Sequence, residues 1–260
     1  MSFPFSRVHL LFLAMGWVAG LIPQGLSAQT SLEEVPPTFR IVSSVGSFDG
    51  LKYEPFLEEG PVSISLRMGI SRKYPLPEKR NLILFREIPP PADSPPGTPP
   101  TRQIVLNLDI PAAGTHFLIV TRPRADDFSS GLLEGVVLKD DSLEHGPREM
   151  LVMNLSDFEI GLLIDQEKYL LPPGDSRFTP LPESSSSVVI RVAANSGTEW
   201  KLIYQGEKRL SPYHRGYLVL SNFLQQPGEY LDPDPPPVRT QSFFEFAPSA
   251  VEALRNSRGK

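Results

Sequence analysis

Residues 62–68, VSISLRM, carry the pattern that decides the fold of this chain. Apolar residues occupy every second position of the stretch, and the residues between them are polar. Because successive side chains of a strand point to opposite faces, this period of two predicts a sheet with one buried and one wet face. Residues 104–110, IVLNLDI, repeat the pattern, and the residues expected to face inward are Ile104, Leu106, Leu108 and Ile110.

Apolar runs of strand length recur along the rest of the chain. Turn signals such as Phe48–Gly50, Pro172–Asp175 and Asn195–Gly197 separate them, which is typical of β-strands joined by short turns. The best helix signal is SAVEALRN at 249–256, with Ser249 as a candidate N-cap. The sequence therefore predicts an all-β fold. Further strands are expected at 39–42, 82–85, 117–121, 132–138, 150–155, 159–164, 188–194, 200–204, 217–223 and 242–246.

A polar segment, KDDSLEHGPRE at 139–149, divides the strand-rich part of the chain. Each side of it has about 100 residues, which is the size of an immunoglobulin-like domain. We therefore expect two immunoglobulin-like β-sandwich domains in tandem, at 38–140 and 148–246, followed by a C-terminal tail at 247–260. A single larger β-sandwich is the alternative, since all-β domains of about 200–250 residues are common.

Proline is concentrated in two segments. Residues 88–102, IPPPADSPPGTPPTR, contain seven prolines. Because proline has no N–H to donate to a sheet, this segment cannot pair as a central strand, and it is expected to project from domain 1 as a stiff extended loop. The sequence DPDPPP at 232–237 is a second spacer, which precedes the last strand.

Residues 1–28 have the layout of a secretory signal peptide. Arg7 and His9 form a short polar region, an apolar run follows from Leu10 to Ile22, and Ser27 and Ala28 precede the expected cleavage site. The run is shorter than the ~20 apolar residues that span a bilayer, which favours cleavage over an uncleaved membrane anchor. We therefore expect an exported protein, periplasmic or extracellular, with no membrane span in the mature chain.

The amino-acid composition limits which partners the chain is expected to bind and which chemistry it can carry out. Removing Arg7 with residues 1–28 leaves 24 basic and 30 acidic residues, a net charge of −6. A mildly acidic chain without a basic stripe is a poor candidate for binding nucleic acid. The chain has no cysteine, which excludes disulfides, thiolate metal sites, cysteine nucleophiles and a lipid anchor on cysteine.

The histidines and acidic pairs show no catalytic arrangement. His116, His145 and His214 stand apart, without a second histidine at ligand spacing. The acidic pairs Glu58–Glu59, Asp126–Asp127 and Asp140–Asp141 are expected to be solvated in loops, or to point to opposite faces of a strand. We therefore predict no catalytic residue, no metal site and no cofactor.

Two further features are interpreted without a functional role. Trp200 is the only tryptophan after residue 28. We expect it to lie in the core, since large aromatic side chains dominate cores, rather than to form an exposed carbohydrate platform. Asn154-Leu155-Ser156 is a formal N-glycosylation sequon, but such triplets arise often by chance.

The second half of the chain resembles uncharacterised exported bacterial immunoglobulin-like β-sandwich proteins. The resemblance rests on MLVMNLS at 150–156, FEIGLLID at 158–165, LLPPG at 170–174 and VVIRVA at 188–193. In that family a short Asn-Leu-Ser/Thr turn precedes a hairpin and a Pro-Pro-Gly turn. The resemblance implies a β-sandwich and an envelope location, and it brings no catalytic residues. A fainter likeness runs to periplasmic pilus chaperones, whose paired basic cleft residues are not assigned in this sequence.

These observations favour a non-catalytic exported protein that acts as a binding or structural module of the cell envelope. Its expected partner is another envelope protein or a surface polymer, because loops on rigid sandwiches commonly carry binding sites. Two alternatives stay open. One is a hydrolase with a cleft of scattered acids, and the other is a periplasmic chaperone or assembly factor for surface fibres that acts by strand donation.

Overall fold

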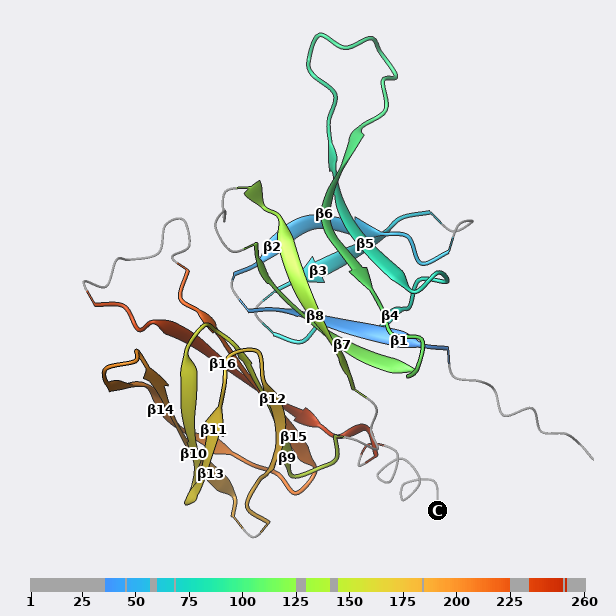
Figure 1. Cartoon of the computed structure of the whole chain (residues 1–260). Coiled ribbons are helices and arrows are strands. Elements are labelled where there is room, and N and C mark those ends of the chain that lie inside the picture. Colours follow the sequence, from blue (N-terminus) through green and yellow to red (C-terminus); the bar gives the residue numbers. More distant parts are fainter. Residues whose placement is uncertain are drawn as a thin grey trace, which may run out of the picture. The chain divides into compact units, whose positions relative to one another are not determined.

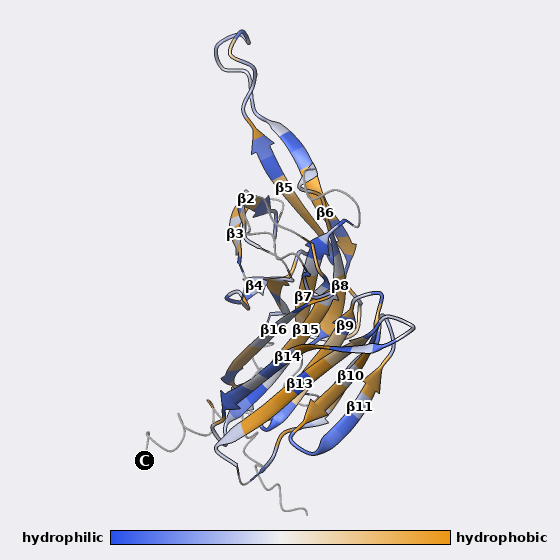
Figure 2. Ribbon diagram, turned by 90° about the vertical axis from the view of Figure 1, so that its left-hand side faces the viewer, coloured by the Kyte–Doolittle hydropathy of each residue, from blue (hydrophilic) through white to orange (hydrophobic). Residues whose placement is uncertain are grey.

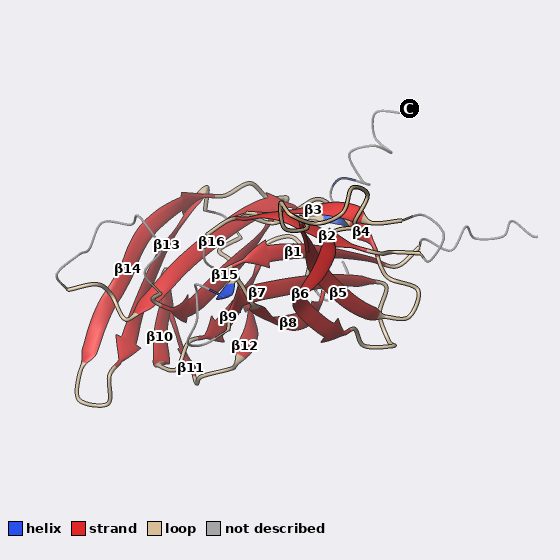
Figure 3. Cartoon of the chain, turned by 90° about the horizontal axis from the view of Figure 1, so that it is seen from above, coloured by secondary structure: helices blue, strands red, loops and turns tan. Residues whose placement is uncertain are grey.

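The computed structural model describes residues 36–44, 46–56, 60–67, 69–124, 130–140, 145–183, 185–224, 234–249 and 251. Strands dominate among these residues, and their helical backbone is confined to short segments (Figure 3). The first eight strands are β1 (Thr38–Ser43), β2 (Phe48–Tyr53), β3 (Val62–Leu66), β4 (Tyr74–Pro75), β5 (Asn81–Ile88), β6 (Thr101–Asp109), β7 (His116–Pro123) and β8 (Leu133–Lys139). The next eight are β9 (Glu149–Leu155), β10 (Glu159–Ile164), β11 (Glu167–Leu171), β12 (Ser176–Pro180), β13 (Ser187–Asn195), β14 (Trp200–Arg209), β15 (His214–Asn222) and β16 (Val238–Phe246).

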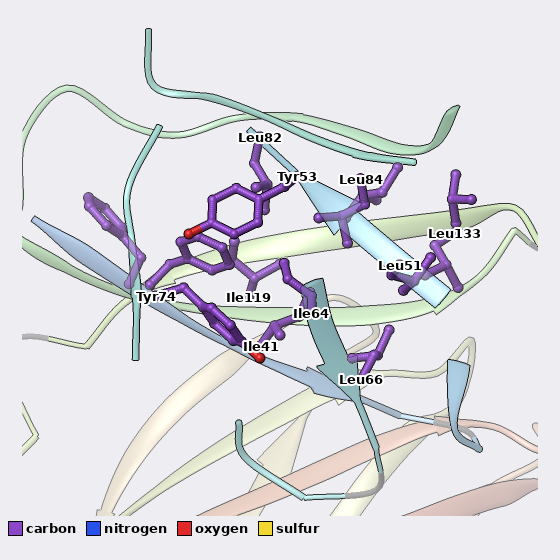
Figure 4. Close-up of a cluster of buried hydrophobic side chains, with 14 of the residues drawn as sticks. Ile41, Leu51, Tyr53, Ile64, Leu66, Tyr74, Leu82, Leu84, Ile119 and Leu133 are labelled. Carbon is purple, nitrogen blue, oxygen red and sulfur yellow. The ribbon is translucent and has the colours of Figure 1, made fainter. Parts of the chain in front are cut away.

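The strands form four sheets of four strands each (Figure 1). The orders β4-β1-β7-β8 and β3-β2-β5-β6 use strands of the first half, and the orders β12-β9-β15-β16 and β11-β10-β13-β14 use strands of the second half. Each half has its own buried core, and Figure 4 shows the first of them, with Tyr53, Leu84 and Ile119 among its members. The prediction of an all-β fold made of two β-sandwiches is confirmed.

The two sandwiches have the same topology. Numbered from its own start, each has one sheet in the order 4-1-7-8 and one in the order 3-2-5-6. In each, the first strand pairs in parallel with the seventh: β1 with β7, and β9 with β15. Two halves of one chain that share strand order and strand direction form an internal structural repeat, which the amino-acid pattern alone did not show.

A β-bulge occurs in the equivalent hairpin of each sandwich. Between β5 and β6 the register shifts so that Val105 is an extra residue, and between β13 and β14 the extra residue is Ile203. A bulge reverses the alternation of faces on one side of it. Ile104 and Leu106 would share a face in a regular strand, but they lie on either side of the bulge. Ile104 therefore points outward and is 54% exposed, whereas Leu106 is buried. The expectation that Ile104 faces inward is wrong for this reason.

The strands β1, β7, β9 and β15 are buried on both faces. Their inward side chains fill the core of their own sandwich, and their outward side chains meet in a third apolar cluster between the two sandwiches, which belong to one compact unit. The sequence of a strand that is buried on both faces is a continuous apolar run rather than an alternation of apolar and polar residues. The cluster contains Val42, Leu118, Val120, Leu151, Met153, Leu155, Tyr217 and Val219.

Gly216 occupies a crowded position on β15. It lies on β15 between β9 and β16, and a Cβ placed there would lie 2.8 Å from Phe244 Cε1 and 3.2 Å from Met150 Cε. We expect Gly216→Ala to lower the free energy of unfolding by about 1–3 kcal/mol through overpacking, measured by urea unfolding. The matched control is Gly146→Ala, whose Cβ would meet Glu149 Oε2 at an ordinary 3.6 Å. Equal stability of the two variants would contradict the prediction.

The segments expected to be irregular are more ordered than their composition indicates. Phe48–Gly50 was expected as a turn, but it begins β2 and forms an irregularity in its pairing with β3. The Pro-rich segment is also shorter than expected, since Ile88 pairs with Thr101 and Glu87 with Arg102. Residues 89–100 are therefore the tip of the β5–β6 hairpin, which extends beyond its sandwich in Figures 1 and 2.

Other expectations fall partly or wholly outside the described residues. Residues 1–28 lie outside them. Of the expected C-terminal helix, Ser249 and Val251 have helical backbone, and the remaining residues of 249–256 are not described. Within the described part of the chain, no helix has the length and apolar character needed to cross a membrane.

Candidate functional site: an exposed apolar face on the second sandwich

Trp200 lies on the outer face of a sheet and not in the core. It is the first residue of β14, pairs with Asn195 of β13, and is 49% exposed. Its ring lies over Gly161 of β10, where a Cβ would come within 3.1 Å of the indole. The prediction of a core tryptophan is wrong because the bulge at Ile203 breaks the alternation of β14. Trp200 and Leu202 face outward before the bulge, while Ile203 and Tyr204 pack against the core after it.

A row of cross-strand neighbours continues from the indole across the whole sheet. Leu170, Gly161, Ala193 and Leu202 stand side by side on β11, β10, β13 and β14. Leu170 and Leu202 are 55% and 58% exposed, and the small residues between them leave an open groove of about 410 Å³. We call this surface the Trp200 face. Apolar residues line most of it, and β10 and β13 are largely orange in Figure 2.

Cationic side chains border the Trp200 face on one side. Lys168 and Arg191 belong to the next cross-strand row, with Leu163 between them. Arg191 lines the groove and donates from Nε to Gln205 Oε1 at 3.1 Å. The face therefore combines an aromatic platform, apolar walls and positive charge, although the chain as a whole is acidic.

The first sandwich has a groove on its equivalent sheet. Ile104 occupies the position before the bulge that Leu202 occupies in the second sandwich, and Phe85 lies beside it. The Arg102 guanidinium lies 4.6 Å from the centre of the Phe85 ring and forms an ion pair of 2.7 Å with Glu54. This groove has a volume of about 400 Å³, and Arg102 in its lining is already engaged by Phe85 and Glu54.

The histidines are held by local contacts. The Thr38 hydroxyl lies 2.9 Å from His116 Nδ1, and the ring of His214 packs edge-on to Phe246. His145 is fully buried between Phe178 and Tyr217, although it follows the polar segment after β8. Among the described residues, no three His, Asp or Glu side chains gather where they would hold a metal ion.

Of the acidic pairs, Glu58–Glu59 and Asp126–Asp127 lie outside the described residues, as does Asp141. Asp140 is 5% exposed, so the expectation that it is solvated is wrong. It accepts hydrogen bonds from Arg40 of β1, in the first sandwich, and from Arg215 and Tyr217 of β15, in the second.

Glu245 completes this charge cluster. Its carboxylate accepts from Arg40 Nη1 at 2.5 Å and from Arg215 Nε at 2.8 Å. The Tyr217 hydroxyl also lies between the two acids, 2.9 Å from Asp140 Oδ1 and 3.0 Å from Glu245 Oε1. Two arginines thus face two carboxylates between the sandwiches, and the cluster is neutral in charge.

The cluster keeps both carboxylates ionised. Burial alone would raise the pKa of Asp140, but His145, whose Nδ1 lies 3.8 Å away, and the Arg40 and Arg215 guanidinium groups favour the carboxylate. Together they hold the pKa of Asp140 well below its usual range. The pKa of Glu245 is lowered in the same way, against burial, by Arg40 and Arg215. A carboxylate held this way is a poor proton donor or acceptor near neutral pH, so the cluster joins the sandwiches rather than forming an acid–base pair.

Asn154 of the sequon is buried near the end of β9, and both its amide nitrogen and its amide oxygen form hydrogen bonds. Its Nδ2 lies 2.8 Å from the Phe158 carbonyl and 3.0 Å from the Leu171 and Pro172 carbonyls. Its Oδ1 accepts from the backbone N–H and the hydroxyl of Ser156. An N-linked glycan requires this nitrogen at the surface, so the folded chain cannot be modified at Asn154.

No family model matches the sequence, and no curated protein matches it. The resemblance to exported immunoglobulin-like proteins and the likeness to pilus chaperones therefore stay predictions.

Proposed function

We propose that the protein is a non-catalytic, exported binding module that holds a partner in the cell envelope through the Trp200 face. The observation that carries the proposal is the half-exposed indole of Trp200, which lies over Gly161 beside two exposed leucines. Contiguous apolar patches on the surface of soluble proteins often mark binding sites. Tryptophan is also enriched among the residues that dominate binding energy in interfaces.

The arrangement of the face supports binding rather than core packing. Ala193 and the indole that covers Gly161 lie at the centre of the groove, and Leu170 and Leu202 form its walls. Lys168 and Arg191 border the face on one side, so an acidic or neutral partner is favoured over a basic one. By contrast, the buried Asp140 and the partly buried Glu245 are paired with arginines, which disfavours the alternative of an acidic hydrolytic cleft.

The test uses residues 29–260 and the envelope fraction of the producing cell. The purified chain is co-sedimented with this fraction, and binding is also followed by the emission of Trp200, the only tryptophan after residue 28. We expect emission to move to shorter wavelength as the partner displaces water from the indole. Trp200→Ala is expected to weaken binding about 30-fold, corresponding to about 2 kcal/mol for an aromatic hot spot.

The matched control is Tyr213→Ala, which removes an aromatic side chain of similar exposure, 44%, from the turn between β14 and β15. Both variants are expected to stay folded, since neither side chain is buried. If Trp200→Ala binds the envelope fraction as well as the parent protein and Tyr213→Ala do, the proposal is wrong.

A further inference from the structure

The tip of the β5–β6 hairpin is longer than the fold requires. Twelve residues, 89–100, join β5 to β6, whereas the equivalent strands of the second sandwich, β13 and β14, are joined by the four residues 196–199. Antiparallel neighbours need as few as two connecting residues. Long connections in compact domains are usually functional or disordered, and this one is ordered by proline and by turns.

The tip is a preformed and exposed peptide. Its hydrogen bonds join tip residues to one another: Ser94 N–H donates to the Pro91 carbonyl at 3.0 Å, and Thr98 donates to the Pro95 carbonyl from its N–H at 3.1 Å and from its hydroxyl at 2.7 Å. All tip residues other than Pro90 and Ser94 are exposed. Because proline fixes φ, such a segment loses little conformational entropy when it binds.

The Trp200 face has the chemistry that Pro-rich peptides bind. Proline-rich segments dock in grooves lined by aromatic side chains, against which the pyrrolidine rings pack. The triplet Pro89–Pro91 would span about 9 Å at ~3.1 Å per residue. Two strand spacings of ~4.8 Å cover about the same distance, which is the separation between Gly161 on β10 and Leu202 on β14.

The charges of the two surfaces are complementary. Asp93 is the only charged residue among 89–100, and it is exposed at the end of the tip. Lys168 and Arg191 border the groove on one side. An acidic tip beside a cationic rim is attracted, whereas a basic Pro-rich peptide would be repelled.

We propose that the Pro-rich tip at 89–100 of one copy of this chain docks on the Trp200 face of a second copy. The inference rests on the proposed function, since it names the partner of the same face. Tip and groove are different surfaces, so the contact is heterologous. Repeated contacts of this kind build open chains or closed rings rather than a dimer with one shared patch.

The experiment uses residues 29–260 alone, in sedimentation equilibrium and in tryptophan emission over a range of concentrations. We expect concentration-dependent association with a shift of Trp200 emission to shorter wavelength. A synthetic peptide of residues 88–102 should produce the same shift and dissociate the assemblies. Two variants each lack one surface: Trp200→Ala lacks the groove, and a chain in which Asn-Gly replaces 89–100 lacks the tip.

Mixing the two variants gives the decisive result. Each alone is expected to be at least tenfold weaker in self-association, while the mixture should form a 1:1 dimer, because one variant keeps the tip and the other keeps the groove. Circular dichroism of each variant establishes that it is folded. Monomers at all concentrations, with no emission shift on adding the peptide, would overturn the inference. Retained Trp200-dependent binding to the envelope fraction would then leave the proposed function standing.

Discussion

Asp140→Asn is expected to lower the free energy of unfolding by about 3–5 kcal/mol. The substitution keeps the shape of the side chain but removes the charge that Arg40, Arg215 and the Tyr217 hydroxyl all face. Removing one partner from a buried ionic cluster leaves the opposite charges desolvated without compensation. This cost exceeds the net stabilisation that the intact cluster provides. Urea unfolding followed by circular dichroism measures the difference.

A control and a double variant separate this cause from a general loss of stability. Asp109→Asn changes an exposed acid on β6 and should stay within about 0.5 kcal/mol of the parent protein. Arg40→Met combined with Asp140→Asn should be less destabilising than the sum of the two single variants, because the uncompensated charge has gone. Additive effects within about 0.3–0.5 kcal/mol would show that the two groups do not interact and would contradict the prediction.

The same cluster sets the pH range of the effect. Because the pKa of Asp140 is lowered in the folded protein, its contribution is present above the ordinary carboxyl pKa of ~3.9 and is lost as pH falls through the lower folded value. The difference between the parent protein and Asp140→Asn should therefore be constant above about pH 5 and should shrink below about pH 4. A difference that grows on acidification would assign the effect to another group.

The fold was predictable wherever one face of a strand is wet. The alternation of 62–68 led to β3 and that of 104–110 to most of β6, because a wet face leaves polar residues at every second position. For β7, β9 and β15 the sequence pattern predicted a strand, but it did not predict what each face of the strand packs against. Both faces of these strands are dry, one in a core and one between the sandwiches, and an apolar run does not say which surface covers it.

The candidate site was harder to predict, for two physical reasons. The exposure of Trp200 depends on the bulge at Ile203, and one extra residue reverses the face of its neighbours without a distinctive sequence. The available signal was the small residues Gly161 and Ala193 in otherwise apolar strands. Burial of Asp140 depends on Arg40 and Arg215, which are 100 and 75 residues away in the sequence, and local patterns carry no information at that distance.

Asn154→Asp is expected to destabilise the protein by about 3–5 kcal/mol at pH 7, although the two side chains have the same shape. The substitution removes the amide hydrogens shared by the Phe158, Leu171 and Pro172 carbonyls. Each lost hydrogen bond costs about 1 kcal/mol, and the desolvated carboxylate facing carbonyl oxygens adds a further penalty. Asn107→Asp is the matched control, because Asn107 is exposed on β6 and uses its oxygen as an acceptor from Asn81.

The carboxyl group introduced at position 154 is expected to have a raised pKa, whereas that of Asp140 is lowered, so the deficits of the two variants shrink in different pH ranges. A carboxyl group buried among carbonyl oxygens has a raised pKa in the folded state, so folding takes up a proton and stability relative to the parent protein falls as pH rises. When protonated, the acid can again donate to one of the three carbonyls. The deficit of Asn154→Asp should therefore shrink between pH 7 and pH 5, in equilibrium unfolding by urea, while that of Asp140→Asn stays constant. A deficit below about 1 kcal/mol at pH 7, or one that is independent of pH, would mean that the Asn154 amide does not anchor the turns at 158 and 172.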